Sequence, residues 1–220
     1  MSKNKGDLVS KEKSLFTRQI CISFTLILLL IAPISFSMAG DVEAGKSKSI
    51  VCSACHGQDG NSINPVWPSL AGQHKQYTTH TLRAYQNGTR VDAVMQAQVM
   101  ALTEQDLEDI AAYYNAQTMQ KKDYGYGLAK KGESLYRGGN ASTGVAACIA
   151  CHGPTGRGNP GAGYPSLAGQ HAGYTKNALK DYTNTERKAG LNDMMQSLAT
   201  RLTAEEIEAV SEYIQALGSK

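Results

Sequence analysis

The feature that most constrains this chain is a short motif that occurs twice. Two cysteines separated by two residues and followed at once by histidine occupy Cys52–His56 and, 96 positions later, Cys148–His152. The segment Pro-Ser-Leu-Ala-Gly-Gln-His at 68–74 recurs without change at 165–171, and the Leu-Thr pair at 102–103 recurs 100 positions later. Because the matches keep their order, the sequence predicts a duplicated domain of about 80–90 residues.

The first 39 residues differ from the rest. Five Lys or Arg residues precede an apolar run from Ile20 to Ile31, and Ser37-Met38-Ala39 offers the small residues that a signal peptidase reads. The run is shorter than the roughly 20 residues that span a bilayer. We therefore expect residues 1–39 to be a signal peptide removed on export; an uncleaved membrane anchor is the alternative. In either case the folded part lies outside the cytoplasm.

The remaining chain is expected to form two domains, at 40–119 and 129–220, joined by a linker at 120–128. The linker has two glycines, mixed charges and no apolar periodicity, as turn-rich connections do. Without the signal segment the chain carries 17 basic and 17 acidic residues, and this balance excludes a nucleic-acid binder, which needs a basic stripe. The halves differ, however: residues 40–120 have a net charge of −3 and residues 121–220 of +3.

Each half is predicted to be helical, because no stretch alternates apolar and polar residues as strands do. The last helix of each half opens with a capping-box pattern, with Asp106 three residues after Thr103 and Glu206 three residues after Thr203. The fold class is therefore all-α, with predicted helices at 42–52, 75–87, 103–117, 172–183 and from Thr203 onward.

Two glycines are expected to let helices cross closely. Gly45 lies in the first helix of the first half and Gly132 in the matching place of the second. Tyr113 and Tyr213 lie at equivalent positions in the two last helices. A residue without a side chain opposite each aromatic ring allows the first and last helices of a half to approach.

The Cys-x-x-Cys-His motif is the attachment signature of c-type haem. Two thiols add across the two vinyl groups of the porphyrin, and the histidine projects its imidazole at the iron. A redox dithiol is one alternative, and a zinc site is another, although zinc would need both cysteine pairs in one place. The repeat favours two covalently bound haem c groups, held by Cys52, Cys55, His56, Cys148, Cys151 and His152.

The ligand on the other face of each haem decides its chemistry, because methionine there raises the reduction potential and suits electron transfer. Met95 and Met195 each lie seven residues before the shared Leu-Thr pair, so they are the expected ligands. Met100 aligns with a threonine and Met194 with a valine, and both are expected to pack in the core.

Histidine is the alternative ligand for the second face. His74 and His171 recur, although each lies close to the loop on the side of the attached histidine, and His80 has no counterpart.

The histidines of the two Cys-x-x-Cys-His motifs need hydrogen-bond acceptors that set their tautomer. Pro68 follows His56 by 12 residues and Pro165 follows His152 by 13, and a proline carbonyl is readily left free to accept. Tyr77 and Tyr174 also recur. For these two tyrosines, a hydrogen bond to a haem propionate and ordinary core packing both stay open.

Taken together, these features resemble the dihaem cytochrome c4 family, as do Arg137-Gly138-Gly139 and the helix endings at 109–113 and 211–217. The resemblance implies two class I cytochrome c domains related by a pseudo-twofold axis, with the haem propionate edges facing each other. It places the iron ligands on His56, Met95, His152 and Met195. It also implies a periplasmic protein, loosely associated with the membrane, that carries electrons from a quinol-oxidising complex to a terminal oxidase.

The expected function is electron transfer in respiration between redox protein partners, without an enzyme's catalytic residues and without a small-molecule substrate. Two alternatives remain open. A dihaem peroxidase or thiosulfate-oxidising enzyme would need one haem without a methionine ligand. A dihaem electron-accepting subunit of a sulfur-oxidising or other dehydrogenase complex would resemble the same family.

Overall fold

The computed structural model describes residues 39–120, 122, 127–184, 187 and 193–217. The expected signal peptide lies outside these residues except for Ala39, as do residues 121 and 123–126 of the expected linker. The described residues contain no strand, only three isolated bridges, so the all-α prediction is confirmed. None of the helices in these ranges is long and apolar enough to cross a membrane.

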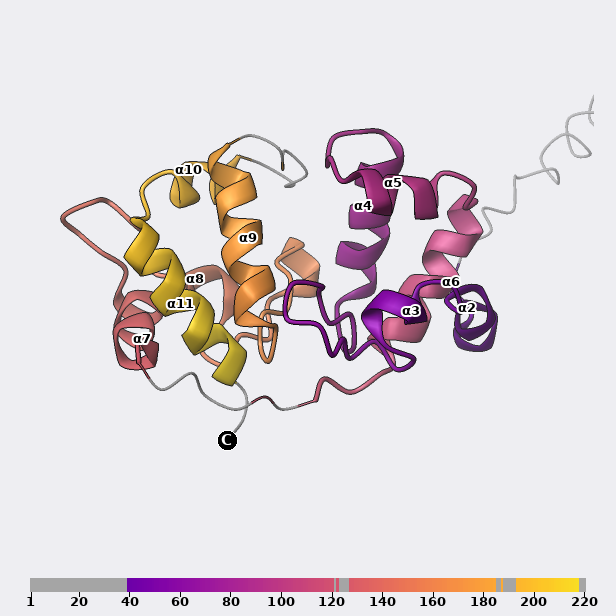
Figure 1. The fold of residues 1–220 in the computed structure, drawn as a ribbon, viewed down its shortest axis with the longest axis horizontal. Coiled ribbons are helices and arrows are strands. Elements are labelled where there is room, and N and C mark those ends of the chain that lie inside the picture. Colours follow the sequence, from indigo (N-terminus) through magenta and orange to yellow (C-terminus); the bar gives the residue numbers. More distant parts are fainter. Residues whose placement is uncertain (1–38, 121, 123–126, 185–186, 188–192, 218–220) are drawn as a thin grey trace, which may run out of the picture. The chain divides into compact units, whose positions relative to one another are not determined.

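The α-helices of the two halves match one to one in chain order (Figure 1), and the C-terminal half has one additional 3-10 turn. The N-terminal half, residues 39–120, contains α2 (Val42–Lys48), α3 (Ser53–His56), α4 (Lys75–Gln86), α5 (Ala93–Val99) and α6 (Glu104–Asn115). The C-terminal half, residues 127–217, contains α7 (Ala129–Gly138), α8 (Ile149–His152), the 3-10 turn η1 (Pro160–Ala162), α9 (Ala172–Thr183), α10 (Met194–Ala199) and α11 (Ala204–Ala216).

The last helix of each half begins where its capping box was predicted. The Thr103 hydroxyl accepts the Asp106 N–H at 3.2 Å, and the Asp106 carboxylate accepts the Thr103 N–H at 2.8 Å. Thr203 and Glu206 make the same pair of bonds with the same lengths. Each box satisfies two backbone groups that the first turn of a helix otherwise leaves without partners.

The first predicted helix, 42–52, is shorter in the structure. It ends at Lys48, and a separate turn of helix then carries the cysteine motif. Ser49 and Ser53 each donate a hydroxyl to a carbonyl three residues earlier, at 3.0 and 2.6 Å. Such local bonds compete with the helical ladder, and they accompany the change of direction between α2 and α3.

No helix was predicted in the segment before each last helix, and the structure shows a short helix there. The Asp92 carboxylate accepts the N–H groups of Val94 and Met95, both at 3.0 Å, and so starts α5. Asp193 is the N-cap residue of α10, but its side chain makes no hydrogen bond to the first turn of that helix. Helices of six or seven residues are too short to show a clear apolar period in sequence.

The predicted close crossings of first and last helices are confirmed. A Cβ atom at Gly45 would overlap the Asp109 carbonyl and lie 2.9 Å from the Tyr113 Cβ. A Cβ at Gly132 would overlap the Ala209 carbonyl and lie 2.9 Å from the Tyr213 Cβ. The absence of a side chain therefore sets the distance between α2 and α6, and between α7 and α11.

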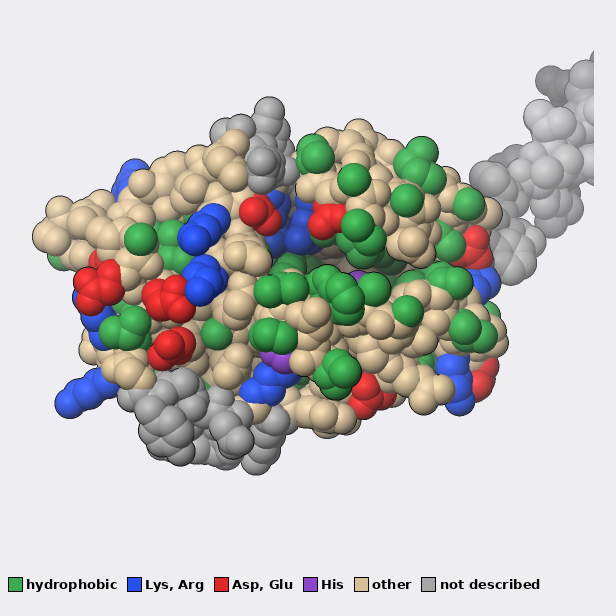
Figure 2. All heavy atoms as spheres, viewed as in Figure 1, with side chains coloured by type: hydrophobic (Ala, Val, Ile, Leu, Met, Phe, Trp, Pro, Cys, Tyr) green, Lys and Arg blue, Asp and Glu red, His purple; other side chains and the backbone are tan. Residues whose placement is uncertain are grey.

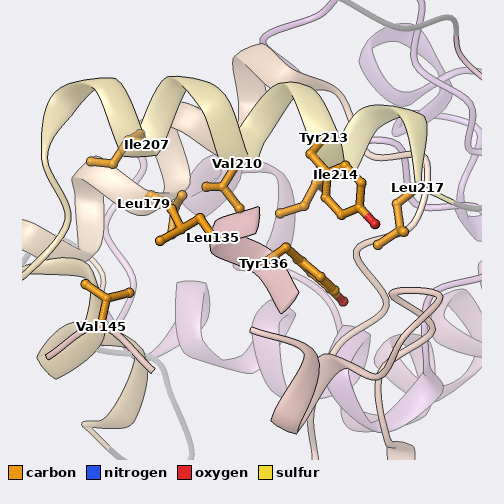
Figure 3. Packing of buried hydrophobic residues seen from close by; sticks show 9 residues of the cluster. All are labelled: Leu135, Tyr136, Val145, Leu179, Ile207, Val210, Tyr213, Ile214 and Leu217. Atoms are coloured by element: carbon orange, nitrogen blue, oxygen red, sulfur yellow. The ribbon is translucent and has the colours of Figure 1, made fainter. Parts of the chain in front are cut away.

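The two halves differ in the size of their main clusters of buried apolar side chains. Buried side chains of α7, α9 and α11 pack together in the C-terminal half (Figure 3), with one residue from the loop before α8 and one just after α11. The cluster comprises Leu135, Tyr136, Val145, Leu179, Ile207, Val210, Tyr213, Ile214 and Leu217. The corresponding cluster of the N-terminal half has three fully buried members, namely Ile110, Tyr113 and Tyr114.

The unchanged repeat segment forms reciprocal hydrogen bonds between the halves. The Gln170 amide donates to the Ser69 carbonyl at 2.8 Å and accepts the Ser69 N–H at 2.9 Å. The Gln73 amide donates to the Ser166 carbonyl and accepts the Ser166 N–H, both at 2.9 Å. Each glutamine thus pairs with the backbone of the other copy in the way that neighbouring strands pair.

We expect Gly132→Ala to lower the free energy of unfolding by about 3 kcal/mol, in the upper part of the range for overpacking, because the new methyl group meets backbone on α11. Gly138→Ala is the matched control: it lies in the same helix, and no atom lies within 4 Å of the position its Cβ would occupy. Thermal unfolding followed by circular dichroism compares the two. Equal midpoints for both variants would contradict the close crossing.

Candidate haem sites

Each cysteine motif lies on one turn of helix that positions its histidine. The His56 N–H bonds to the Cys52 carbonyl at 3.0 Å in α3, and the His152 N–H bonds to the Cys148 carbonyl at 2.9 Å in α8. All four cysteines are half-buried and unpaired by disulfides. The two histidines are almost fully buried. The motif therefore presents two thiols and one enclosed imidazole from a single rigid turn in each half.

The predicted acceptors of the two histidines are confirmed. His56 Nδ1 lies 2.9 Å from the Pro68 carbonyl oxygen, and His152 Nδ1 lies 3.0 Å from the Pro165 carbonyl oxygen. A carbonyl oxygen only accepts, so Nδ1 carries the proton and Nε2 keeps its lone pair. Burial lowers the pKa of both histidines, so each imidazole is neutral and its Nε2 is able to bind a metal ion.

The first cysteine of each pair lies against apolar side chains. Cys52 packs beside the N-terminal buried cluster and Cys148 beside the C-terminal one. Burial raises the pKa of the Cys52 thiol, and it raises that of Cys148 to about 11. These surroundings suit the apolar edge of a porphyrin, since both sulfur atoms are held neutral and away from water.

The structure separates the four candidate methionines into two pairs. Met95 in α5 and Met195 in α10 are half-buried at equivalent positions, and Met195 packs against the C-terminal core. Met100 and Met194, which were expected to pack in the core, are instead 62% and 45% exposed. Met100 caps the C-terminus of α5 and Met194 is the first residue of α10, so each lies at the end of a short helix.

The recurring histidines that were weighed as alternative ligands have other partners. His74 Nε2 lies 2.7 Å from the Arg157 carbonyl oxygen, and His171 Nε2 lies 2.7 Å from the Ser62 carbonyl oxygen. Each ring therefore donates to the backbone of the other half. Because these nitrogens carry protons in those bonds, they have no lone pair for an iron atom.

The residues present fit one haem in each half. A neutral imidazole with a free Nε2 and two thiols lie on one turn, and a half-buried thioether lies on the helix before the last. When bound, haem supplies a one-electron couple between ferrous and ferric iron.

Some residues with consequences for these sites were missed from the sequence. Gln73 and Gln170 join the halves, and Arg90 and Arg187 lie buried between them, where their backbones form an isolated antiparallel bridge. Both pairs are spaced by 97 positions, as is the unchanged segment. The sequence did contain a signal for them: the same residue type recurs 97 positions later in the second copy. Such recurrence is expected of a symmetric contact, because each copy contributes the same residue.

The fold and the paired motifs define a c-type haem protein with two sites. The cytochrome c family model matches residues 42–116 and 129–218. The cytochrome c4 of Thiocapsa roseopersicina is 46% identical over 180 residues, which cover 81% of this chain and 93% of that protein. The crystal structure of reduced recombinant cytochrome c4 from Pseudomonas stutzeri has a TM-score of 0.78 at 43% identity, covering 81% of this chain and 100% of the other.

A more distant relative is a thiosulfate dehydrogenase electron acceptor of Stutzerimonas stutzeri, 33% identical over 178 residues, which cover 78% of this chain and 81% of that protein. The chain belongs to the cytochrome c family and, within it, to the dihaem cytochrome c4 proteins. It is an electron-transfer haemoprotein of two tandem class I cytochrome c domains with two covalently bound haem c groups, and not an enzyme.

We expect the purified protein to keep its colour in the polypeptide after acid–acetone extraction, because thioether bonds hold the haem to the chain. Replacing Cys52 and Cys55 together by serine should leave one haem per chain, and so should replacing Cys148 and Cys151. Mass spectrometry of the intact chain measures this count. Two haems retained in either double variant would contradict the assignment of one motif to one haem.

Proposed function

We propose that the protein is a periplasmic respiratory carrier that takes electrons from a quinol-oxidising complex and passes them to a terminal oxidase. The observation that carries this proposal is that each half has one buried histidine and one half-buried methionine at equivalent positions, which we propose as the two iron ligands. Two such haems have no open coordination position for a substrate, and histidine with methionine favours a high potential. The similarity to cytochrome c4 proteins over four-fifths of the chain supports the same role.

The residue assignments belong to this proposal. Cys52 and Cys55 attach the first haem, with His56 and Met95 as iron ligands. Cys148 and Cys151 attach the second, with His152 and Met195. The proline carbonyls keep Nε2 of each histidine unprotonated, and the surrounding apolar side chains exclude water. No group in either half needs to gain or lose a proton for an electron to move.

The proposed domain boundaries follow from the repeat, and the proposed signal peptide follows from the basic and apolar pattern of the first 39 residues. A signal peptide at 1–39 directs export, domains occupy 40–119 and 129–220, and a linker at 120–128 joins them. An exported location fits covalent haem attachment through four cysteines that form no disulfide bonds. A loose association with the membrane would keep the carrier near both of its partners.

The surfaces of the two halves suit different partners. The N-terminal half is the acidic one and holds nine of the ten exposed large apolar side chains of the described residues, namely Val42, Ile50, Val51, Ile63, Val66, Trp67, Val91, Val94 and Met100. Figure 2 shows apolar side chains gathered over this half. The C-terminal half is basic overall. Such an asymmetry supports one half receiving electrons and the other delivering them.

A second candidate is an electron acceptor bound to a dehydrogenase complex. The relative named as a thiosulfate dehydrogenase electron acceptor favours it, at 33% identity. The higher identity to cytochrome c4 proteins, 46%, favours the respiratory carrier.

Kinetics with both kinds of partner should separate the two candidates. We expect the oxidised protein to be reduced by membranes with a quinol-oxidising complex, and the reduced protein to be oxidised by membranes with a terminal oxidase. Both rates should change with ionic strength, because charged surfaces steer the encounters. Thiosulfate with thiosulfate dehydrogenase is the comparison. Reduction by that enzyme alone would support the second candidate instead.

The methionine assignment gives a spectroscopic prediction. Met95→Ala should abolish the far-red sulfur-to-iron charge-transfer band of one ferric haem and lower its potential, because a thioether favours ferrous iron. Met100→Ala is the matched control; its side chain is 62% exposed, so the change should cost at most about 0.5 kcal/mol and preserve the band. Loss of the band in the Met100 variant alone would overturn the assignment and the repeat register behind it.

A further inference from the structure

Two buried arginines lie together between the halves. Arg90 follows α4 and Arg187 follows α9, and their backbones form an antiparallel bridge. Arg90 is 8% exposed and Arg187 is 6% exposed. Arginine is rarely buried to this degree unless it is paired, because removing its charge from water is costly.

Tyrosines from both halves hold the two guanidinium groups. Each guanidinium lies over a ring of its own half, with Cζ of Arg90 4.7 Å from the Tyr85 centroid and Cζ of Arg187 4.6 Å from the Tyr182 centroid. Such cation–π contacts orient the guanidinium planes but leave the positive charges uncompensated.

The hydroxyl partners are exchanged between the halves. Arg90 Nη2 donates to the Tyr174 hydroxyl of the C-terminal half at 3.1 Å. Arg187 Nη2 donates to the Tyr77 hydroxyl of the N-terminal half at 2.5 Å. Each arginine is therefore positioned by a tyrosine of the other half. The sequence left packing and propionate bonding open for these tyrosines, and the structure shows them bound to arginine.

Among the described residues, the cluster has positive charge and no acidic ion-pair partner. No ion pair between described residues includes either arginine. Nε of Arg187 is buried and makes no hydrogen bond within the described protein. Burial opposes ionisation of the Tyr174 phenol, yet the two guanidinium groups outweigh it and lower its pKa to about 8. An anion bound beside the arginines would satisfy both the charge and the Arg187 Nε donor.

The haem groups supply anions of the right kind, because each carries two propionate carboxylates and guanidinium binds carboxylate through parallel hydrogen bonds. The arginines are also close in sequence to the proposed methionine ligands: Arg90 is five residues before Met95, and Arg187 is eight before Met195.

We propose that Arg90 and Arg187 bind the propionates of the haems in their own halves, and that the crossed tyrosines make each haem's potential depend on the other half. The proposal rests on the proposed haem sites. A guanidinium beside the haem disfavours the ferric form, which carries one more positive charge than the ferrous form. Removing the arginine therefore lowers the potential. Removing its tyrosine partner loosens the same guanidinium and shifts the same potential by less.

The test is an optical redox titration of the holoprotein. Arg90→Gln should change the equilibrium constant for reduction of one haem at least tenfold. For one electron this lowers its reduction potential by about 59 mV or more. Tyr174→Phe should lower that same potential, and the double variant should be non-additive. Arg187→Gln and Tyr77→Phe should act together on the other potential. The controls are Arg83→Gln and Arg137→Gln, which remove exposed charges from the same halves and should shift neither potential.

The outcomes separate this inference from the proposed function. Unchanged potentials in variants that keep two haems and both charge-transfer bands would overturn the inference while leaving the haem ligands intact. A larger shift by Tyr174→Phe in the potential that Arg187→Gln lowers than in the one that Arg90→Gln lowers would overturn the crossed arrangement. Wild-type potentials that respond to added phosphate, with the response lost in Arg90→Gln, would assign the site to a free anion and overturn propionate binding.

A conservative variant keeps the proposal testable if Arg90→Gln does not fold. Arg90→Lys keeps the positive charge but not the paired donors, so its potential should lie between those of the wild type and of Arg90→Gln. If the glutamine variant does not accumulate, an unshifted potential in both Arg90→Lys and Tyr174→Phe would overturn the proposal.

Discussion

The hydrogen bond from the histidine of each Cys-x-x-Cys-His motif to a proline carbonyl is the contact on which the arrangement of both sites depends. It selects the tautomer of His56 and His152, and it also fixes the place of the segment that follows the proline. The next residue after Pro68 is Ser69, whose N–H and carbonyl both bond to Gln170 of the other half. One short segment thus holds the imidazole at its start and joins the two halves immediately afterwards.

This double use explains why seven residues stayed identical while the copies diverged elsewhere. In a symmetric contact, Gln73 meets Ser166 while Gln170 meets Ser69, so a change in one copy disturbs a bond made to the other. The histidines that end the segments add a third crossed pair through the carbonyls of Arg157 and Ser62. Residues outside these contacts were free to change, and the halves have acquired opposite net charge.

Structural features could be predicted from the sequence where they depend on a few neighbouring residues or recur in both copies. The capping boxes, the glycine crossings and the proline acceptors were predicted because each depends on residue type at a fixed place in both copies. Helices α5 and α10 were not predicted, since six or seven residues show too little periodicity. The burial of Arg90 and the exposure of Met100 were also missed, because tertiary packing decides both. The proposed iron ligands and domain boundaries stay predictions.

The buried arginines bear on why the halves form one unit. Placing two guanidinium groups side by side costs free energy that tyrosine rings and hydroxyls return only in part, so the pair by itself weakens the contact between halves. If propionates bind there, as proposed, the cost is offset only once both haems are attached. The crossed hydroxyl bonds of Tyr77 and Tyr174 require both halves to be docked as well. Haem attachment and docking then stabilise each other, and two sequential domains act as one electron-transfer unit.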